Sequence, residues 1–289
     1  MSANLSPYAA KRIVRVQRNV ADLASAVAFY CQALDFECIE QQHDNDPVWA
    51  QALGLPGARA DAVTLRLGAQ FVQLLAFSPA GRAYPDGCQS DELGFQHLAI
   101  VVADMQAAYA QLQRHAFTPI SRDGPQTLPP NTGSVRAFKF RDPDGHPLEL
   151  IEFPAGIGDH VWQSTQGLFL GIDHSAITVA DVAGSVAFYA QLGLHVSAQS
   201  LNQGYAQSQL DNVDNALVDV VALQPQCAGP MHVELLHYRQ AASAALTLHA
   251  NHIAADCLVF ERAATHGGQG IVHLHDPSGH RIMLEPLHE

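Results

Sequence analysis

The hydrophobic pattern of the chain repeats along its length. Three apolar segments with the composition of strands, RIVRVQRNV, FQHLAIVV and IDHSAITV, each run into the tripeptide Val-Ala-Asp. After each tripeptide, apolar residues recur at the spacing of one helix face. The aspartates stand where a helix N-cap is expected, because a carboxylate there can accept the free N–H groups of the first turn. Each segment therefore predicts a strand followed by a helix capped by Asp22, Asp104 or Asp181.

Two of these helices have nearly the same sequence. Val20–Tyr30 and Val179–Tyr189 share eight of eleven residues at a separation of 159 positions. The turn DPDGH, which ends at His146, returns as DPSGH, which ends at His280. A fixed internal period indicates a repeated structural unit. We expect His146 and His280, which follow glycine turns, to be turn and edge residues.

Short strand candidates separated by turn residues complete each unit. They are AVTLRL and QFVQLLAF in the first unit, VRAFKF and HPLELIEF in the second, LVDVVAL and MHVELLHY in the third, and GIVHL and HRIMLEPL in the last. The pattern predicts an α+β fold of four βαβββ units, at residues 8–80, 92–155, 168–240 and 250–289. In the fourth unit almost nothing separates the first strand, DCLVFERA, from the second, so we expect this unit to lack its helix.

Composition and charge narrow the class of partner. The chain has 289 residues and a formal net charge of -13, from 28 acidic and 15 basic residues. This charge repels phosphate backbones and anionic lipid, which argues against nucleic acid or a membrane surface and favours a small-molecule partner. The sequence shows neither a signal peptide nor a run of about 18 apolar residues, so we expect a cytoplasmic protein. The five cysteines form no CxxC pair and indicate neither a disulfide framework nor a cysteine zinc site.

The repeated motifs resemble those of a known family. Four βαβββ units, an Asp-capped helix carrying AFY, and a last strand announced by DPDGHPLEL are together similar to the vicinal oxygen chelate superfamily. That superfamily includes glyoxalase I, extradiol ring-cleaving dioxygenases and the bleomycin- and fosfomycin-resistance proteins. The resemblance covers nearly the whole chain. It implies that two units combine into a cup-shaped mixed β-sheet, with metal ligands supplied by the first and last strand of each unit.

Counting from the repeated motifs locates these ligand positions. The first-strand position lies seven residues before the capping Asp, which gives Arg15, His97 and His174 in the first three units. Alignment of the fourth unit, which lacks the cap, gives Cys257. The last-strand residues are Gln73, Glu149, Glu234 and Met283. In the fourth unit, His249 or His252 is the alternative to Cys257 but lies nearer a linker. Glu285, two residues further along the same strand face, is the alternative to Met283.

The two middle units hold all the good ligands. Arg cannot lose its proton, and a Met thioether is a soft, weak ligand for Zn or Fe(II). Pairing consecutive units would leave each cup with one His and one Glu. We therefore predict that units two and three share one cup, whose metal ligands resemble those of bacterial glyoxalase I and are His97, Glu149, His174 and Glu234. Units one and four would form a metal-free cup, in which Arg15 forms a salt bridge or anchors an anion.

The resemblance implies three hypotheses about function. The first is a lyase or isomerase of glyoxalase I type, in which one divalent ion (Ni, Zn, Fe, Mn or Co) binds two substrate oxygens while Glu149 or Glu234 moves a proton between adjacent carbons. The second is an Fe(II) or Mn(II) dioxygenase that opens catechol or hydroquinone rings. The third is a non-catalytic protein that binds an antibiotic or another small molecule. Because one chain holds four units, we expect a monomer or a homodimer.

Overall fold

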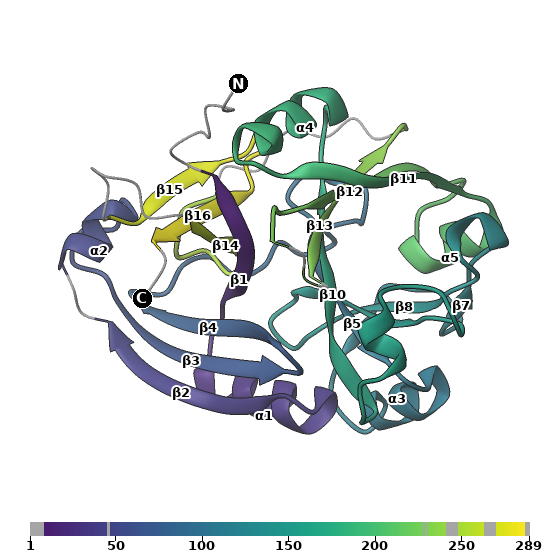
Figure 1. The fold of residues 1–289 in the computed structure, drawn as a ribbon. Helices are drawn as coiled ribbons and strands as arrows, with labels where there is room; N and C mark the ends of the chain where they lie inside the picture. The colour runs from purple at the N-terminus through teal and green to yellow at the C-terminus, as the bar shows by residue number, and fades with distance from the viewer. Residues whose placement is uncertain are drawn as a thin grey trace.

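Two curved β-sheets stand side by side in the molecule (Figure 1). The structure is a computed structural model, which describes residues 9–44, 47–227, 229, 231–240, 248–262 and 270–286. Within these residues the first sheet has seven strands in the order β15-β16-β14-β1-β4-β3-β2. The second has nine, in the order β11-β12-β13-β10-β5-β9-β8-β6, with β7 paired to β8. No helix of the described residues is long and apolar enough to cross a membrane.

The first sheet joins the two ends of the chain, and the second sheet is built from its middle. The strands of the first sheet are β1 (Ala10–Asn19), β2 (Glu37–Asp44), β3 (Arg59–Leu67), β4 (Gln70–Ser78), β14 (Cys257–Arg262), β15 (Val272–His275) and β16 (Arg281–Pro286). Those of the second are β5 (Gln96–Val102), β6 (Thr118–Pro119), β7 (Gln126–Thr127), β8 (Arg136–Arg141), β9 (Pro147–Glu152), β10 (Phe169–Thr178), β11 (His195–Gln203), β12 (Leu217–Gln224) and β13 (His232–Tyr238). The predicted α+β fold of repeated units in two mixed sheets is confirmed.

The helices are short and lie outside the sheets. They are α1 (Leu23–Leu34), α2 (Pro47–Ala52), α3 (Met105–Leu112), α4 (Val182–Gln191) and α5 (Tyr205–Asp211), with 3-10 turns at Pro130–Thr132 and His160–Gln163. The predicted N-caps are confirmed for α1 and α3, where Asp22 accepts from Ser25 N at 2.8 Å and Asp104 accepts from Ala107 N at 3.0 Å. Asp181 stands at the N-cap of α4 but its side chain makes no capping hydrogen bond. The predicted loss of a helix from the fourth unit concerns residues 263–269, which lie outside the described residues.

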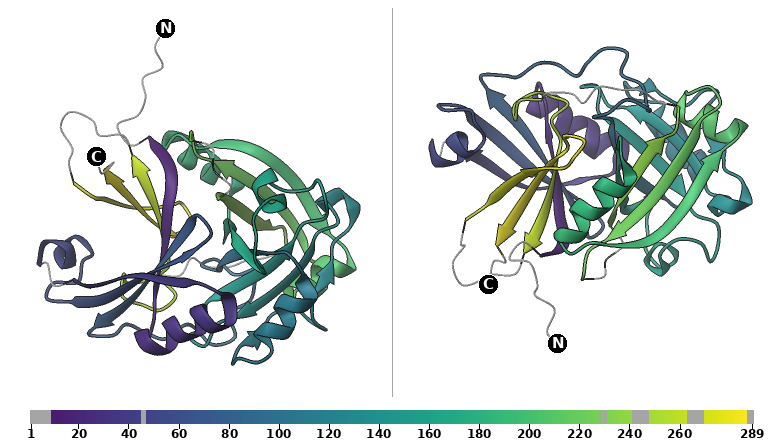
Figure 2. Two further views of the ribbon diagram at one scale, coloured as in Figure 1. Left: turned by 60° about the horizontal axis from the view of Figure 1, so that its bottom comes forward. Right: turned by 90° about the horizontal axis from the view of Figure 1, so that it is seen from above.

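A large core joins the two sheets to the helices. Its buried side chains come from α1, α3, α4 and both sheets, and include Tyr30, Leu98 and Leu258. Helices α1 and α3 lie side by side (Figure 2), and Gln111 Nε2 of α3 donates to Asp35 Oδ1 at the end of α1 at 2.8 Å. The opposite, concave faces of the sheets carry smaller apolar clusters. The cavities described below lie on these concave faces.

All four units share one strand register. In each unit the first strand runs parallel to the last, and the last-strand position lies opposite the residue two places after the first-strand position. The four cross-strand pairs are Gln17 with Gln73, Ala99 with Glu149, Ala176 with Glu234, and Val259 with Met283. Residues two apart on a strand point to the same face. The eight aligned positions are therefore equivalent in the fold as well as in the sequence.

The repeated turn motifs dock one unit onto the next. Tyr30 of α1 donates its hydroxyl to Asp142 Oδ2 at 3.1 Å, and Tyr189 of α4 donates to Asp276 Oδ2 at 3.3 Å. The expectation that His146 and His280 are edge residues is wrong, because both are buried. The backbone turn points their rings inward, where His146 Nδ1 lies 3.1 Å from Asp142 Oδ2. The attraction between the two charges offsets part of the cost of burying them.

Candidate metal centre

Four neighbouring strands of the second sheet carry the predicted ligands. His97 lies on β5, Glu149 on β9, His174 on β10 and Glu234 on β13, and these strands are consecutive in the sheet order. All four side chains line one cavity of about 180 Å³ on the concave face. The register described above places them there, since each occupies the same position of its unit. The structure thus brings together the four residues that the sequence singled out.

Three of the four donor groups converge closely. One ligand atom from each of His97, Glu149 and His174 lies within 4.8 Å of the other two. His97 Nε2 is 2.7 Å from Glu149 Oε2, and His174 Nε2 is 3.9 Å from the same oxygen. Glu234 Oε2 lies 3.5 Å from His174 Nε2, while its Oε1 lies 3.5 Å from His232 Nε2. The fourth group is therefore close to the other three but turned partly away from them.

The buried histidine nitrogens make this set suitable for a cation. Both ring nitrogens of His97 and Nε2 of His174 are buried and have no hydrogen-bond partner among the described residues. The contact of His97 with Glu149 is short, but its geometry is not that of a hydrogen bond. Buried polar atoms are rarely left unsatisfied, because each costs free energy. A divalent ion would satisfy these atoms with the nitrogen and oxygen ligands that it prefers.

A bulge in β10 lets two consecutive side chains face the cavity. The pairing of β10 with β5 shifts register between Ile172 and His174, so Asp173 is the extra residue. Asp173 Oδ2 lies 3.0 Å from His174 Nδ1, and Trp162 Nε1 donates to Asp173 Oδ1 at 2.9 Å. A carboxylate on one imidazole nitrogen orients the ring and leaves the other nitrogen available to a metal. His174 Nε2 is in this position.

Burial and neighbouring charge shift the pKa values of the site. Burial and the nearby Lys139 lower the pKa of His97 to about 4, so its ring is neutral at pH 7. Burial acts to raise the pKa of Glu149, but Lys139 and His97 outweigh it and lower that pKa to about 2. Burial acts to lower the pKa of His174, but Glu234 and Asp173 outweigh it and raise that pKa to about 9. At pH 7 the site therefore holds ionised carboxylates around a protonated His174, whose Nε2 proton a bound cation would displace.

Three further residues of the cup were not found from the sequence. Asp173 joins the site only because of the β10 bulge, which no periodicity signals. His232 lies two residues before Glu234 on β13, and its Nε2 is 3.5 Å from Glu234 Oε1. Lys139 interrupts the apolar strand β8 directly opposite Glu149, and its buried Nζ lies 2.7 Å from Asp211 Oδ1. The single Lys within VRAFKF was the available sign of a functional position.

The equivalent positions of the first sheet differ in chemistry. Arg15 Nε donates to Gln73 Oε1 at 3.2 Å, and both Nη atoms of Arg15 contact the carboxylate of Glu285, which confirms the predicted salt bridge. Cys257 and Met283 are buried in an apolar cluster. Within the described residues, no group of three metal-binding side chains converges on this face. His249 and His252 line neither cup.

Known proteins share this fold. A family model described as the Glyoxalase/Bleomycin resistance protein/Dioxygenase superfamily matches residues 12–150 and 171–284. The uncharacterised protein YaeR of Escherichia coli is 29% identical over 149 residues, which cover 49% of this chain and 96% of YaeR. Glyoxalase I from Zea mays superposes with a TM-score of 0.58 at 16% identity, covering 95% of this chain and 92% of the maize chain. A proposed dioxygenase from Bacillus subtilis gives 0.58 at 12% identity, covering 96% and 86%.

Proposed function

Because this chain belongs to the glyoxalase/bleomycin resistance protein/dioxygenase superfamily, we propose that its second sheet holds one divalent metal ion and catalyses a lyase or isomerase reaction of glyoxalase I type. The observation that carries the proposal is the convergence of two His and two Glu side chains on one buried cavity. His97, Glu149, His174 and Glu234 would hold the ion. When bound, it would polarise two neighbouring oxygens of a small substrate and so acidify the adjacent C–H bond.

The two glutamates are suited to different tasks. The side chain of Glu149 is 7% exposed and lies against His97, whereas that of Glu234 is 22% exposed and lies between His174 and His232. A base must reach the substrate, so the more accessible carboxylate is the better candidate. Glu234 would take the proton from one carbon and return it to the next. Glu149 would remain a fixed ligand.

Lys139 and the apolar wall would orient the substrate. Lys139 lines the cavity with a buried ammonium that is paired with Asp211, and its remaining N–H groups can donate to a substrate oxygen. The apolar wall facing it would exclude water and hold the body of the substrate; it consists of Leu128, Val135, Ile151, Val218, Val220 and Leu236. The cavity of about 180 Å³ fits a small molecule.

Metal content is the first test. We expect about one divalent ion per chain in anaerobically purified protein, and none in the His97→Ala plus His174→Ala double variant. The matched control is His160→Ala plus His195→Ala, which removes two exposed histidines and should keep the metal. A protein that binds no metal even after reloading would contradict both enzymatic hypotheses and would favour a non-catalytic binding protein.

Activity then tests the role of Glu234. We expect conversion of a hemithioacetal or another alpha-hydroxycarbonyl compound by the metal-loaded protein, and exchange of the substrate C–H with solvent deuterium. Glu234→Gln should lower kcat by at least about 100-fold, because general-base catalysis contributes about 10²- to 10⁴-fold, with a much smaller loss of metal. Metal-loaded protein that leaves every such substrate unchanged would overturn the lyase or isomerase proposal.

One observation favours a second candidate, ring-cleaving oxygen chemistry. His97, His174 and Glu149 form a close set of two histidines and one carboxylate, while Glu234 turns towards His232. This three-ligand set with open positions suits non-haem Fe(II) and oxygen. Oxygen uptake by the iron-loaded protein with catechols and hydroquinones, without hemithioacetal turnover, would establish this alternative.

A further inference from the structure

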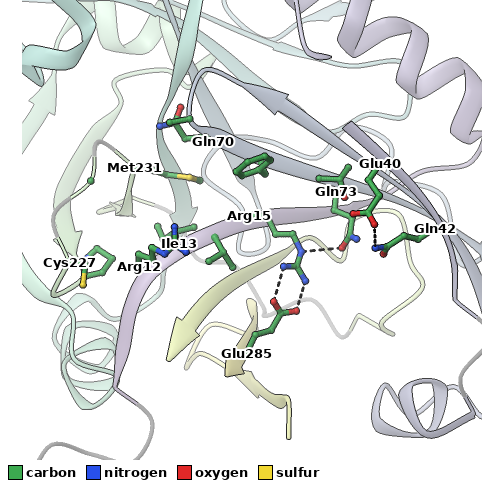
Figure 3. A pocket seen from close by; sticks show the side chains of 16 residues that line it. Arg12, Ile13, Arg15, Glu40, Gln42, Gln70, Gln73, Cys227, Met231 and Glu285 are labelled. Carbon is green, nitrogen blue, oxygen red and sulfur yellow. Dashed lines mark hydrogen bonds and ion pairs between the residues drawn. The ribbon is translucent and has the colours of Figure 1, made fainter. Parts of the chain in front are cut away.

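The first sheet also has a cavity on its concave face. It measures about 570 Å³, against about 180 Å³ for the metal cup, and lies between the concave face of the sheet and the connection from β12 to β13 (Figure 3). Binding pockets for organic ligands have volumes of about 300 to 1,000 Å³. The cavity therefore has the size of a ligand site, although it lacks the His and Glu ligands of its counterpart.

Both arginines of this cavity are already neutralised. Arg15 lies at its base between Gln73 and Glu285 (Figure 3), and its side chain is 20% exposed. Arg12 at the edge pairs with Glu261, with its Nε 2.9 Å from Glu261 Oε2. Neither guanidinium therefore offers a free positive charge to an anion. Arg15 and Gln73 still have N–H groups that can donate hydrogen bonds to a ligand.

Glu40 gives the cavity an unbalanced negative charge. Its carboxylate accepts a hydrogen bond from Gln42 Nε2 at 2.8 Å (Figure 3), and no ion pair to a cation is formed by it among the described residues. The formal charge of the whole chain is -13, which adds to the local negative potential. A positively charged group at the Glu40 side of the cavity is therefore favoured over a negatively charged one.

Apolar side chains supply the remaining wall. Ile13 of β1, Phe71 of β4 and Met231 before β13 line the cavity beside the polar groups. Such a wall can bury the hydrocarbon part of a ligand, and an aromatic ring face also attracts a nearby cation. The lining thus combines a carboxylate at one side, an apolar wall, and hydrogen-bond donors at the base.

From this combination we infer that the first-sheet cavity is a second ligand site, which binds an amphipathic organic cation. The ammonium or similar head lies at Glu40, and the apolar body lies against Phe71 and Met231. A polar end, where the ligand has one, accepts hydrogen bonds from Arg15 and Gln73. Binding of the cation at this site does not require a metal ion in the second-sheet cavity.

A matched pair of probes tests the charge preference. We expect isothermal titration calorimetry to give a Kd of about 1 mM for 4-phenylbutylammonium, an affinity typical of a ligand with so few atoms. The anion 4-phenylbutyrate should bind at least about tenfold more weakly. Glu40→Gln should weaken binding of the cation by about three- to tenfold. Glu37→Gln removes an exposed carboxylate of the same strand outside the cavity, and should leave binding unchanged. The two variants change the net charge equally.

A chemical label locates the bound probe without a disruptive variant. Cys227 lines the cavity with an exposed thiol, and Cys38 is an exposed thiol of β2 outside it. Saturating 4-phenylbutylammonium should slow the modification of Cys227 by a methanethiosulfonate reagent and leave Cys38 unaffected. The His97→Ala plus His174→Ala variant should show the same protection. Equal affinity for the anion, no binding up to about 10 mM, or no protection of Cys227 would each overturn the inference.

Discussion

One extra residue in β10 determines how His174 is held. Without the bulge, Asp173 would point to the opposite face of the sheet, because neighbouring residues of a strand alternate. The bulge instead brings the Asp173 carboxylate to His174 Nδ1 at 3.0 Å, while Trp162 fixes the other oxygen. A small local irregularity thus supplies the group that orients a proposed metal ligand.

We predict that Asp173→Asn lowers metal affinity by about 10- to 100-fold, the usual effect of losing a carboxylate behind a histidine ligand. The amide keeps the size of the side chain but not its charge. Asp219→Asn, which removes a carboxylate of β12 that pairs with Arg239 outside the cavity, is the control and should not change the affinity. Competition with a chromophoric chelator measures both variants. An unchanged affinity in Asp173→Asn would show that the ring is held without the carboxylate.

The sequence located residues whose positions repeat and missed those that a local irregularity creates. His97 and Glu149 could be found because each stands at a fixed distance from a repeated motif. Asp173 could not, since a bulge changes which face a residue joins without leaving a mark in the hydrophobic pattern. His232 shares the face of Glu234, so the periodicity of β13 could indicate it, but the repeat assigns only one ligand position to each strand.

At the scale of elements, the repeated helices act through their tyrosines. Tyr30 accepts a hydrogen bond from the buried Arg18 at 3.0 Å and donates to Asp142 of the next unit. Tyr189 makes only the second contact, to Asp276, at 3.3 Å. The AFY motif and the DPxGH turn were predicted separately as helix and turn. The contact between them explains why the AFY motif of units one and three is matched by the DPxGH turn of units two and four.

This difference predicts unequal costs for two matched variants. Tyr30→Phe should lower the free energy of unfolding by about 2 to 4 kcal/mol, because it leaves buried charged groups of Arg18 and Asp142 with one partner fewer. Tyr189→Phe should cost about 1 kcal/mol, since it removes one long hydrogen bond. Urea unfolding followed by circular dichroism measures both. A larger cost for Tyr189→Phe would contradict the proposed role of Arg18.

The second strands of units one and three were harder to predict. The outer strands β2 and β11 are largely exposed, and their polar sequences lack the alternation that marks a half-buried strand. Each is held by pairing with the next strand rather than by its own apolar residues. The central strands β5 and β10 are buried throughout, so their continuous apolar sequences were recognisable.

At the scale of the molecule, the two halves of the chain are interleaved. Each family-model match spans two consecutive units, but each sheet combines one unit from either match. β10 of the second half pairs with β5 of the first, and β14 of the second half pairs with β1 of the first. Neither half contains a whole cup, and each carries one His and one Glu of the proposed metal set.

We therefore predict that the chain can be divided between Gly156 and Ile157, two exposed residues that link the halves. The fragments 1–156 and 157–289 should form a 1:1 complex when refolded together, and this complex should bind one metal ion. Each fragment alone should bind the metal at least about 100-fold more weakly, because loss of two ligands costs several kcal/mol. Size-exclusion chromatography with metal analysis tests this. A fragment that alone binds metal as tightly as the intact protein would exclude a site shared between the halves.

The pairing of β1 with β14 also bears on how the protein is made. β1 can pair with β4 early in synthesis, but Ile13 pairs with Phe260, so the other side of β1 must wait for about 250 further residues before it has its second neighbour. The second sheet is complete once β13 has been made, well before β14 exists. The second sheet can therefore form while the first sheet still has an open edge. During translation that edge is the part of the nascent chain most exposed to misassembly and most in need of chaperone protection.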